Sequence, residues 1–377
     1  MESSGETVRG FSAPVLAVCG FSGSGKTTLL EAAIPRLVKR GLAVAVVKHD
    51  PHYFEVDRPG KDSDRLFRAG ATVVLSRPGE QFERRGSATL TLEATLARLA
   101  ADHDLLLVEG HKDTPLPKFW LASADRQDAP QSVANIVGTL AWESDRLDAF
   151  MAFVERWFPA AWRARPLYGG WLMGGMSSRM GMPKQVTQFG GRTFGEIVSQ
   201  ALQAGLRDGK TVALGMGALP EQLRNVVQLP DPPGLAGPGA GLMAAHRWAP
   251  EAAWIVAACD HPWLSGEHIE WLAAQRQPGY WALIPRQSDG HPCPMLALYE
   301  PQALEALDRR TQGGGERDAH PSTLLDLPHT LLLEPPARLA DGWKNVNTQE
   351  ELRAEEARFV ARRDARDGVR EQDGIER

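Results

Sequence analysis

Short apolar runs alternate with amphipathic stretches along most of the chain. In the first part, apolar runs at 14–19, 43–48, 72–76 and 105–108 predict buried strands, and residues 28–40 repeat apolar side chains at helical spacing before a stop at Gly41. A strand near 135–137 and a helix over 143–158 complete this series. Strands that alternate with helices imply right-handed crossovers and an open parallel sheet.

A second series of the same kind begins at Leu167. Its expected strands are 167–172, 211–214, 254–258, 281–285 and 294–299, and charged residues predominate after Glu350, as in a solvated helix end and frayed tail. The length of 377 residues suits two domains. We predict a disordered lead at 1–12, an α/β domain at 13–160, a linker at 161–166 where the periodicity breaks, a second α/β domain at 167–356 and a charged tail at 357–377.

The composition and charge of the chain argue against a nucleic-acid or membrane partner. The net charge of -5 argues against a nucleic acid or an anionic membrane held by bulk electrostatics, and no apolar run approaches the roughly 20 residues needed to span a bilayer. The polar first residues lack the features of a signal peptide. Three widely spaced cysteines, Cys19, Cys259 and Cys293, favour buried thiols over a disulfide or a metal site. We therefore expect a cytoplasmic protein with no nucleic-acid and no membrane partner.

The first chemical motif is the run Gly20-Phe21-Ser22-Gly23-Ser24-Gly25-Lys26-Thr27, which satisfies the Walker A pattern in full. It lies between the first predicted strand and the first predicted helix, so backbone N–H groups and the helix N-terminus point at phosphate oxygens. Lys26 can neutralise the β- and γ-phosphates, and Thr27 can bind Mg²⁺. The expected nucleotide ligands are Gly20, Gly23, Ser24, Gly25, Lys26, Thr27 and Thr28.

Further polar motifs follow the predicted strands of this domain, where open α/β sheets bind ligands. They are Lys48-His49-Asp50, Asp57-x2-Gly60-Lys61-Asp62-Ser63, Ala69-Gly70-Ala71 and Val108-Glu109-Gly110. Together with the Walker A loop they resemble the molybdopterin-guanine dinucleotide biosynthesis adapter family (MobB) over residues 13–160. The resemblance implies a P-loop domain that binds GTP and Mg²⁺ and assists a guanylyltransferase, and it admits a homodimer through this domain. Glu109 takes the Walker B-like position at the metal, with Asp50 and Asp62 as weaker candidates near the phosphates.

The second chemical motif is Leu172-Met173-Gly174-Gly175-Met176-Ser177-Ser178-Arg179-Met180-Gly181, followed by Lys184. Its spacing differs from the dinucleotide-binding fingerprint. The adjacent glycines Gly174 and Gly175 allow close approach of the backbone to a base or phosphate, and Arg179 and Lys184 supply positive charge for a triphosphate. Nucleotidyl transfer with release of pyrophosphate needs such charge. On this motif alone, an ordinary glycine turn with two solvated cations stays open.

Three downstream segments add to this motif. Gly237-Pro238-Gly239-Ala240-Gly241 opens a predicted helix, and Asn345-Val346-Asn347-Thr348 precedes the last one. Asp260 follows a buried strand, where a carboxylate suits a hard cation such as Mg²⁺, although an aspartate at such a place can also cap a helix. We favour the metal role, because the chain is already rich in phosphate-binding loops.

These motifs resemble the molybdenum cofactor guanylyltransferase family (MobA) over residues 166–356, and they fit the guanylyl type better than the cytidylyl type. The resemblance implies that Leu172, Met173 and Gly174 contact guanine through the backbone. It also implies that Lys184 binds the triphosphate, that Asp231 contacts the nucleotide and that Asp260 holds Mg²⁺. The expected catalytic residues are Arg179, Lys184 and Asp260. The chain departs from that family at Pro183, Gln185 and Gly239, positions that bear on base selectivity.

Both resemblances imply a fusion of a P-loop NTPase-like parallel sheet with a Rossmann-like, GT-A-like nucleotidyltransferase sheet. The expected reaction transfers GMP from GTP to molybdopterin or molybdenum-molybdopterin and releases pyrophosphate. Molybdoenzyme apoproteins or their chaperones are the expected protein partners. Two alternatives stay open. One is another nucleotidyltransferase, which transfers CMP to molybdopterin or a nucleotide to a sugar phosphate. The other is a GTP-dependent scaffold that delivers cofactor, with a degenerate C-terminal domain.

Overall fold

A computed structural model describes residues 10–48, 57–86, 91–143, 145–173, 182–207, 209–313 and 320–375. The chain divides into two compact units, which are described separately below. The N-terminal unit spans Ala13–Phe153, and the C-terminal unit runs from Val154 onward and includes the residues before Ala13. Within the described residues, the helices are all too short or too polar to cross a membrane.

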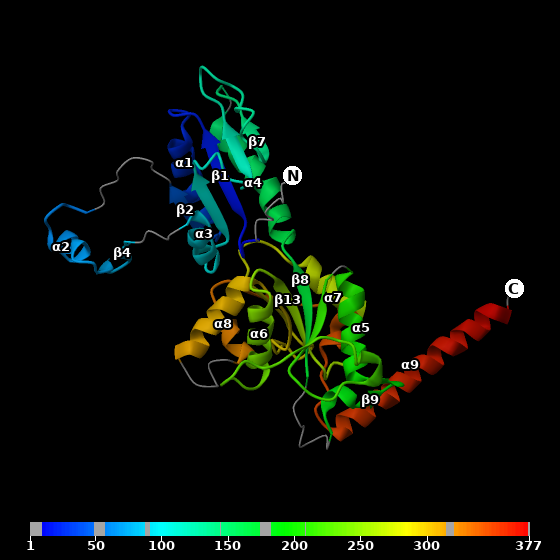
Figure 1. Cartoon of the computed structure of the whole chain (residues 1–377). Coiled ribbons are helices and arrows are strands. Elements are labelled where there is room, and N and C mark those ends of the chain that lie inside the picture. Colours follow the sequence, from blue (N-terminus) through cyan, green and yellow to red (C-terminus); the bar gives the residue numbers. More distant parts are fainter. Residues whose placement is uncertain are drawn as a thin grey trace, which may run out of the picture. The chain divides into compact units, whose positions relative to one another are not determined.

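The N-terminal unit is built on a five-stranded parallel sheet, as predicted (Figure 1). Its strands lie in the order β2-β5-β1-β6-β7. They are β1 (Val15–Gly20), β2 (Val44–Lys48), β5 (Leu105–Glu109), β6 (Lys118–Leu121) and β7 (Ile136–Leu140). Helix α1 (Lys26–Lys39) follows β1, and α3 (Leu92–Ala100) precedes β5. The Walker A loop therefore joins the central strand to a helix, the context that its phosphate-binding role requires.

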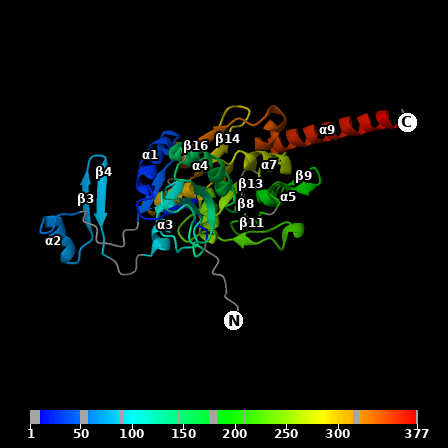
Figure 2. The same ribbon diagram turned by 90° about the horizontal axis from the view of Figure 1, so that it is seen from above.

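The predicted third strand of this sheet was wrong in its pairing. The structure places β3 (Val73–Arg77) in a separate antiparallel hairpin with β4 (Glu80–Arg84), beside helix α2 (Asp62–Arg68) (Figure 2). Gly79, with φ of 79°, allows a tight turn directly after β3. The next strand can therefore pair with β3 in the antiparallel direction, without the long crossover that a parallel pair requires. In the main sheet, the sequence did not predict strand β6. Its apolar run is short and begins with a lysine, Lys118. That lysine is buried, and its ammonium donates to the carbonyls of Leu116 (2.9 Å) and Ala134 (3.0 Å).

The C-terminal unit contains a seven-stranded mixed sheet in the order β12-β11-β8-β13-β15-β14-β16. All five predicted strands form: β8 (Leu167–Leu172), β11 (Thr211–Leu214), β13 (Ala253–Ala258), β14 (Ala282–Pro285) and β15 (Leu296–Tyr299). The short strands β12 (Gln228–Leu229) and β16 (Thr330–Leu333) were not predicted. Strand β15 runs antiparallel to both of its neighbours, whereas β12, β11, β8 and β13 are parallel.

Helices cover both faces of this mixed sheet. Helices α5 (Phe194–Leu206) and α7 (Gly266–Ala274) pack together on one face, and α6 (Pro238–Trp248) and α8 (Pro301–Gly313) on the other (Figure 1). A small hairpin of β9 (Gln188–Phe189) and β10 (Arg192–Thr193) leads into α5. Thr193 and Glu196 form a capping box there, which explains why α5 begins at Phe194.

The stretch predicted as a linker is structured. Helix α4 runs from Arg146 to Arg163, and β8 begins at Leu167, so three residues of the predicted linker are helical. The side chains of Trp162 and Arg165 are buried. The break in apolar periodicity therefore reflects a change of element around buried side chains, and not an exposed connector.

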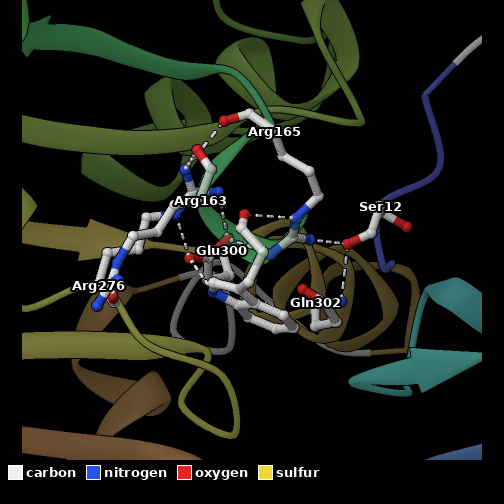
Figure 3. Close-up of polar contacts among 7 residues, drawn as sticks. Ser12, Arg163, Arg165, Arg276, Glu300 and Gln302 are labelled. Carbon is white, nitrogen blue, oxygen red and sulfur yellow. Dashed lines mark hydrogen bonds and ion pairs between the residues drawn. The ribbon is translucent and has the colours of Figure 1, made fainter. Parts of the chain in front are cut away.

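The buried carboxylate of Glu300 binds the side chains of Trp162 and Arg165, between the end of α4 and the start of β8 (Figure 3). It accepts hydrogen bonds from the Trp162 indole (2.9 Å), from Arg165 (3.0 Å) and from Arg276 Nε (2.6 Å). Arg165 also donates to the carbonyl of Ser12, which places the end of the predicted lead on the C-terminal unit. A buried carboxylate between two guanidinium groups keeps its charge compensated.

The predicted frayed tail is helical through residue 375. Helix α9 spans Gln349–Ile375, and Arg358 and Arg362 both bind the carboxylate of Asp341. Phe359 packs on Phe189 at 5.4 Å between ring centroids. Charged residues at helical spacing favour a solvated helix, and the apolar contact fixes its first turns on the domain.

Candidate active site

A pocket of 480 Å³ lies in the C-terminal unit, at the carboxyl ends of β8, β11 and β13. Its charged lining residues are Lys184, Asp231 and Asp260. The other lining residues are mostly apolar or glycine: Leu172, Met173, Leu214, Gly215, Met216, Gly237, Pro238, Gly241, Ala258, Cys259 and Met295. Carboxyl ends of parallel strands are the usual ligand-binding edge of an α/β sheet. The structure thus gathers Leu172, Met173, Lys184, Asp231 and Asp260, which the sequence predicted separately.

Lys184 is the centre of the polar contacts in this pocket. Its ammonium donates to Asp260 Oδ2 and to Asn347 Oδ1, each over 2.7 Å. Lys184 belongs to the 3₁₀ turn η1 (Lys184–Val186), Asp260 follows β13, and Asn347 precedes α9, so three distant segments meet here. The N–H of Val346 donates to the carbonyl of Asp260 over 2.8 Å and joins two of these segments directly.

The helix-cap alternative for Asp260 does not hold in this structure. The next helix, α7, is capped by Ser265. The Asp260 side chain is 13% exposed and turned to Lys184. His261 Nε2 lies 3.6 Å from Asp260 Oδ1, and burial lowers the pKa of this imidazole, so His261 adds no positive charge at neutral pH. Among the described residues, Lys184 is therefore the cation that faces the Asp260 carboxylate.

Close packing shapes the glycine-rich side of the pocket. A Cβ at Gly241 would lie 2.5 Å from the Leu172 side chain, so only glycine lets α6 approach β8 this closely. Gly237, with φ of 75°, precedes Pro238 at the first position of α6. The positive end of α6 is thus part of the pocket wall, where it favours an anion. Burial raises the pKa of Asp231 on the same pocket.

Parts of the predicted site lie outside the described residues: Gly174, Gly175 and Arg179, together with Asp50 of the N-terminal unit. Asn347 was noted as part of a motif but was given no role, because its partner Lys184 is 163 positions away. Met216, Gly237 and Pro238 also line the pocket without having been assigned to the site.

The Walker A loop forms the second candidate site. Lys26 folds over the loop and donates to the carbonyls of Gly20 (3.2 Å) and Phe21 (2.8 Å). The Thr27 hydroxyl donates to Glu109 Oε1 over 2.8 Å, which brings together the two oxygen ligands predicted for Mg²⁺. Lys48 Nζ lies 3.5 Å from the same carboxylate oxygen. The structure thus brings the predicted Walker B-like residue to the loop.

Arg146 also belongs to this second site, and the sequence did not predict it. From the first turn of α4, its guanidinium donates to the carbonyls of Ser24 (2.8 Å) and Ala122 (3.3 Å). A Cβ at Gly25 would lie 3.1 Å from Arg146 Nη1, so the arginine packs tightly under the loop. Burial lowers the pKa of Arg146. Arg146 could not be predicted from the sequence, because it is a single residue that lies 122 positions from its acceptor, Ser24.

The oxygen donors of both sites suit Mg²⁺. Among the described residues, no group of three His, Cys, Asp or Glu side chains gathers around one point. Magnesium commonly takes only one or two protein ligands and completes its shell with water and substrate phosphates. Thr27 with Glu109, and Asp260 alone, match that type of site. By contrast, the side chain of Asp62 is 97% exposed in α2 and pairs with Arg65.

Comparison with known proteins gives the class of each unit. Residues 15–142 match the family of molybdopterin guanine dinucleotide synthesis protein B, and residues 171–324 match the MobA-like NTP transferase domain. The chain is similar to the molybdopterin-guanine dinucleotide biosynthesis adapter protein of Haemophilus influenzae, with 40% identity over 111 residues. That match covers 29% of this chain and 62% of the adapter, so less than two thirds of the adapter is spanned.

Two further relatives are covered more fully. The probable adapter protein of Bacillus subtilis is 32% identical over 136 residues, which are 34% of this chain and 75% of that protein. The probable molybdenum cofactor guanylyltransferase of Bacillus cereus strain Q1 is 31% identical over 188 residues, which are 48% of this chain and 90% of that protein. The fold and the comparisons therefore define a P-loop adapter domain and an NTP transferase domain. The chain belongs to the MobB adapter family through its N-terminal part and to the molybdenum cofactor guanylyltransferase family through its C-terminal part.

Proposed function

We propose that the chain transfers GMP from GTP to molybdopterin, or to molybdenum-molybdopterin, in the pocket of its C-terminal unit. The observation that supports this most directly is the convergence of Lys184, Asp260 and Asn347 at 2.7 Å contacts within a pocket of 480 Å³. The pocket lies in the part of the chain that matches the MobA-like NTP transferase domain. An ammonium, a carboxylate and a helix N-terminus suit a triphosphate and its divalent cation.

The chemistry requires little beyond positioning and charge. A phosphate oxygen of molybdopterin attacks the α-phosphorus of GTP, the bond to the β-phosphate oxygen breaks, and pyrophosphate leaves. The attacking oxygen is already ionised near neutral pH, so no general base is needed. An ammonium has three donors, and two of those of Lys184 go to Asp260 and Asn347, which leaves one for a phosphate oxygen in the described part of the site. Asp260 would hold Mg²⁺, whose charge would stabilise the leaving pyrophosphate.

Guanine recognition by the backbone of Leu172 and Met173 belongs to the same proposal. The Met173 N–H is already bonded to the Leu214 carbonyl over 3.0 Å, and the Leu172 carbonyl accepts from Cys259 Sγ over 2.8 Å. Of the two Met173 backbone groups, only the N–H has a hydrogen-bond partner in the described part of the chain, and we propose that the carbonyl oxygen contacts the base. A carbonyl acceptor suits the N1–H and amino donors of guanine.

We further propose that the N-terminal unit binds GTP and Mg²⁺ through Lys26, Thr27 and Glu109 and assists the transferase. The contact of Thr27 with Glu109 at 2.8 Å supports this role. Transfer of the product to molybdoenzyme apoproteins or their chaperones, and a homodimer through the N-terminal domain, remain proposals. Three buried free thiols suit a reducing compartment, and we propose the cytoplasm.

Product identity tests this function. The purified full-length chain is incubated with molybdopterin, molybdate, Mg²⁺ and one nucleoside triphosphate at a time, and the products are identified by mass spectrometry. We expect a guanine dinucleotide with GTP and no dinucleotide with the other triphosphates. A cytosine product would overturn the base assignment. The absence of any dinucleotide would favour the delivery scaffold.

A further inference from the structure

The two oxygen partners of Lys184 are held on separate loops. Asp260 lies on the loop that follows β13, and Asn347 lies on the segment between the 3₁₀ turn η5 (Ala337–Trp343) and α9. Lys184 contacts both oxygens at 2.7 Å, so its position depends on the spacing between these loops. The hydrogen bond of Val346 to the Asp260 carbonyl joins these loops at one point, and the buried imidazole of His261 hydrogen-bonds to the backbone of Gly342 and Lys344 at another.

Glu355 of α9 provides a further link, made by its side chain. Its side chain is only 5% exposed, although it lies on a highly charged helix. One carboxylate oxygen accepts the indole N–H of Trp263 over 2.7 Å, three residues after Asp260. The other oxygen accepts from the ammonium of Lys344, three residues before Asn347. One carboxylate thus joins the loop of Asp260 to the segment of Asn347.

The Trp263 ring extends this link to the segment that follows Lys184. It packs edge-to-face on Phe189 of β9, with 5.5 Å between centroids, and the Arg362 guanidinium lies 4.6 Å from its centroid. Phe189 follows the 3₁₀ turn that carries Lys184 by only a few residues. All three segments that meet at the ammonium of Lys184 therefore also meet around Trp263 and Glu355.

Anchoring of α9 alone does not require this buried carboxylate. The side chain of Leu352 is part of the apolar core, and Phe359 packs against it. Arg358 and Arg362 bind Asp341 from the same helix. Besides Trp263 and Lys344, the Glu355 carboxylate contacts only Arg358 of its own helix, over 3.5 Å, among the described residues. Burying a carboxylate has a desolvation cost that apolar residues avoid, so its retention between donors on two separate loops points to a role in spacing.

We propose that Glu355 is a positioning residue for guanylyl transfer: it fixes the distance between Asp260 and Asn347 and thereby places the Lys184 ammonium. This inference rests on the proposed function of the pocket. Loss of the link leaves the pocket walls in place but lets the two oxygens move apart. Groups that only orient a reacting or metal-binding residue contribute about 10- to 100-fold to activity or affinity.

Glu355→Gln is the informative variant. It keeps the side-chain volume and one acceptor oxygen, but with that oxygen on Trp263 the amide presents only N–H donors to the Lys344 ammonium. Leu352→Ala is the matched control. It weakens the packing of the same helix but leaves the hydrogen bonds of Glu355 to Trp263 and Lys344 unchanged. Glu350→Ala, on the exposed face of that helix, controls for loss of charge.

Two readouts are compared at equal folded fraction. The first is hydrogen exchange at the Val346 amide, which donates to the Asp260 carbonyl; the second is steady-state transfer with GTP. We expect Glu355→Gln to speed Val346 exchange, to lower kcat about 10- to 100-fold and to leave KM for GTP within about threefold. Leu352→Ala and Glu350→Ala should leave Val346 exchange and kcat near the wild-type values.

A double-mutant cycle separates positioning from general destabilisation. Lys344→Met should lower kcat in the wild-type background and have no further effect in the Glu355→Gln background, because both changes break the same arm. Equal changes in Glu355→Gln and Leu352→Ala, or additive effects in the cycle, would overturn the inference. If the wild-type chain transfers no nucleotide, the proposed function fails, and the positioning role of Glu355 is then judged from Val346 exchange alone. Faster exchange in Glu355→Gln supports that role, and unchanged exchange overturns it.

Discussion

Lys184 donates a hydrogen bond to the Asp260 carboxylate over 2.7 Å, although 76 positions separate the two residues in the chain. Both side chains are largely buried, with exposures of 17% and 13%. Removal of one partner would leave the other charge uncompensated in the pocket, which is costlier than loss of an exposed pair. The pair is therefore a preformed arrangement of charge, set before a triphosphate arrives.

Replacing Lys184 by methionine should lower kcat for pyrophosphate release about 10²–10³-fold, because the variant loses a positive charge aimed at the phosphates. The Asp260 carboxylate would then face the triphosphate without its cation and repel it. A coupled pyrophosphate assay measures the effect. Lys210→Ala, a lysine packed over Tyr168 and Trp248, is the matched control and should retain turnover. Near-normal turnover in Lys184→Met would remove this residue from the site.

Replacing Arg146 by glutamine should weaken GTP binding to the N-terminal unit about tenfold. The variant loses two charge-assisted hydrogen bonds to the carbonyls of Ser24 and Ala122, each worth about 1.5–3 kcal/mol, and part of that loss falls on the Walker A loop. Titration with a fluorescent GTP analogue gives the affinity. Arg98→Gln, an exposed arginine of α3, should bind like the wild type. Equal affinities for all three proteins would rule out a role of Arg146 in shaping the loop.

Replacing Glu300 by alanine should lower the free energy of unfolding of the C-terminal unit by about 3–5 kcal/mol, since it leaves Arg165 and Arg276 buried without their shared carboxylate. Urea unfolding followed by tryptophan fluorescence measures this change. Glu334→Ala serves as the control, because that side chain is 75% exposed and its pair with Arg286 contributes little. A loss in Glu300→Ala no larger than in Glu334→Ala would contradict the buried network.

The thiols of Cys19 and Cys293 should be unreactive in the folded chain at pH 8. Burial raises the pKa of Cys19 to about 11 and that of Cys293 to about 12, so neither forms the reactive thiolate. An aromatic disulfide reagent should detect both only after unfolding. Because the unfolded thiols ionise near pH 9.0, their contribution to stability is complete below that pH and is lost as the pH rises toward 11 and 12. Fast labelling of Cys293 at pH 8 in the native protein would contradict this prediction.

The sequence predicted elements and loop motifs well, because both are local. Walker A spacing placed Lys26 and Thr27, and the strand that ends before Asp260 placed that carboxylate at the sheet edge. Pairing partners were harder to predict. The apolar run of β3 was read as part of the main sheet, since run length does not reveal which strand it pairs with.

Long-range polar partners left no readable signal at all. The bonds of Arg146 to Ser24 and of Trp162 to Glu300 join positions more than a hundred residues apart, and nothing in the sequence around either residue indicates its partner. The stretch predicted as a linker contains the buried side chains of Trp162 and Arg165, which a break in apolar periodicity does not reveal. The same holds for Glu355, which lies in a run of charges.

The central claim is that nucleotidyl transfer takes place at Asp260 and not at the Walker A loop. The most direct measurement follows label from GTP carrying ³²P at the α-phosphate into molybdopterin, with the wild type, Asp260→Ala and Lys26→Ala. We expect labelled product with the wild type and with Lys26→Ala, and none with Asp260→Ala in a protein that remains folded. Labelled product from Asp260→Ala, or its loss only in Lys26→Ala, would contradict it.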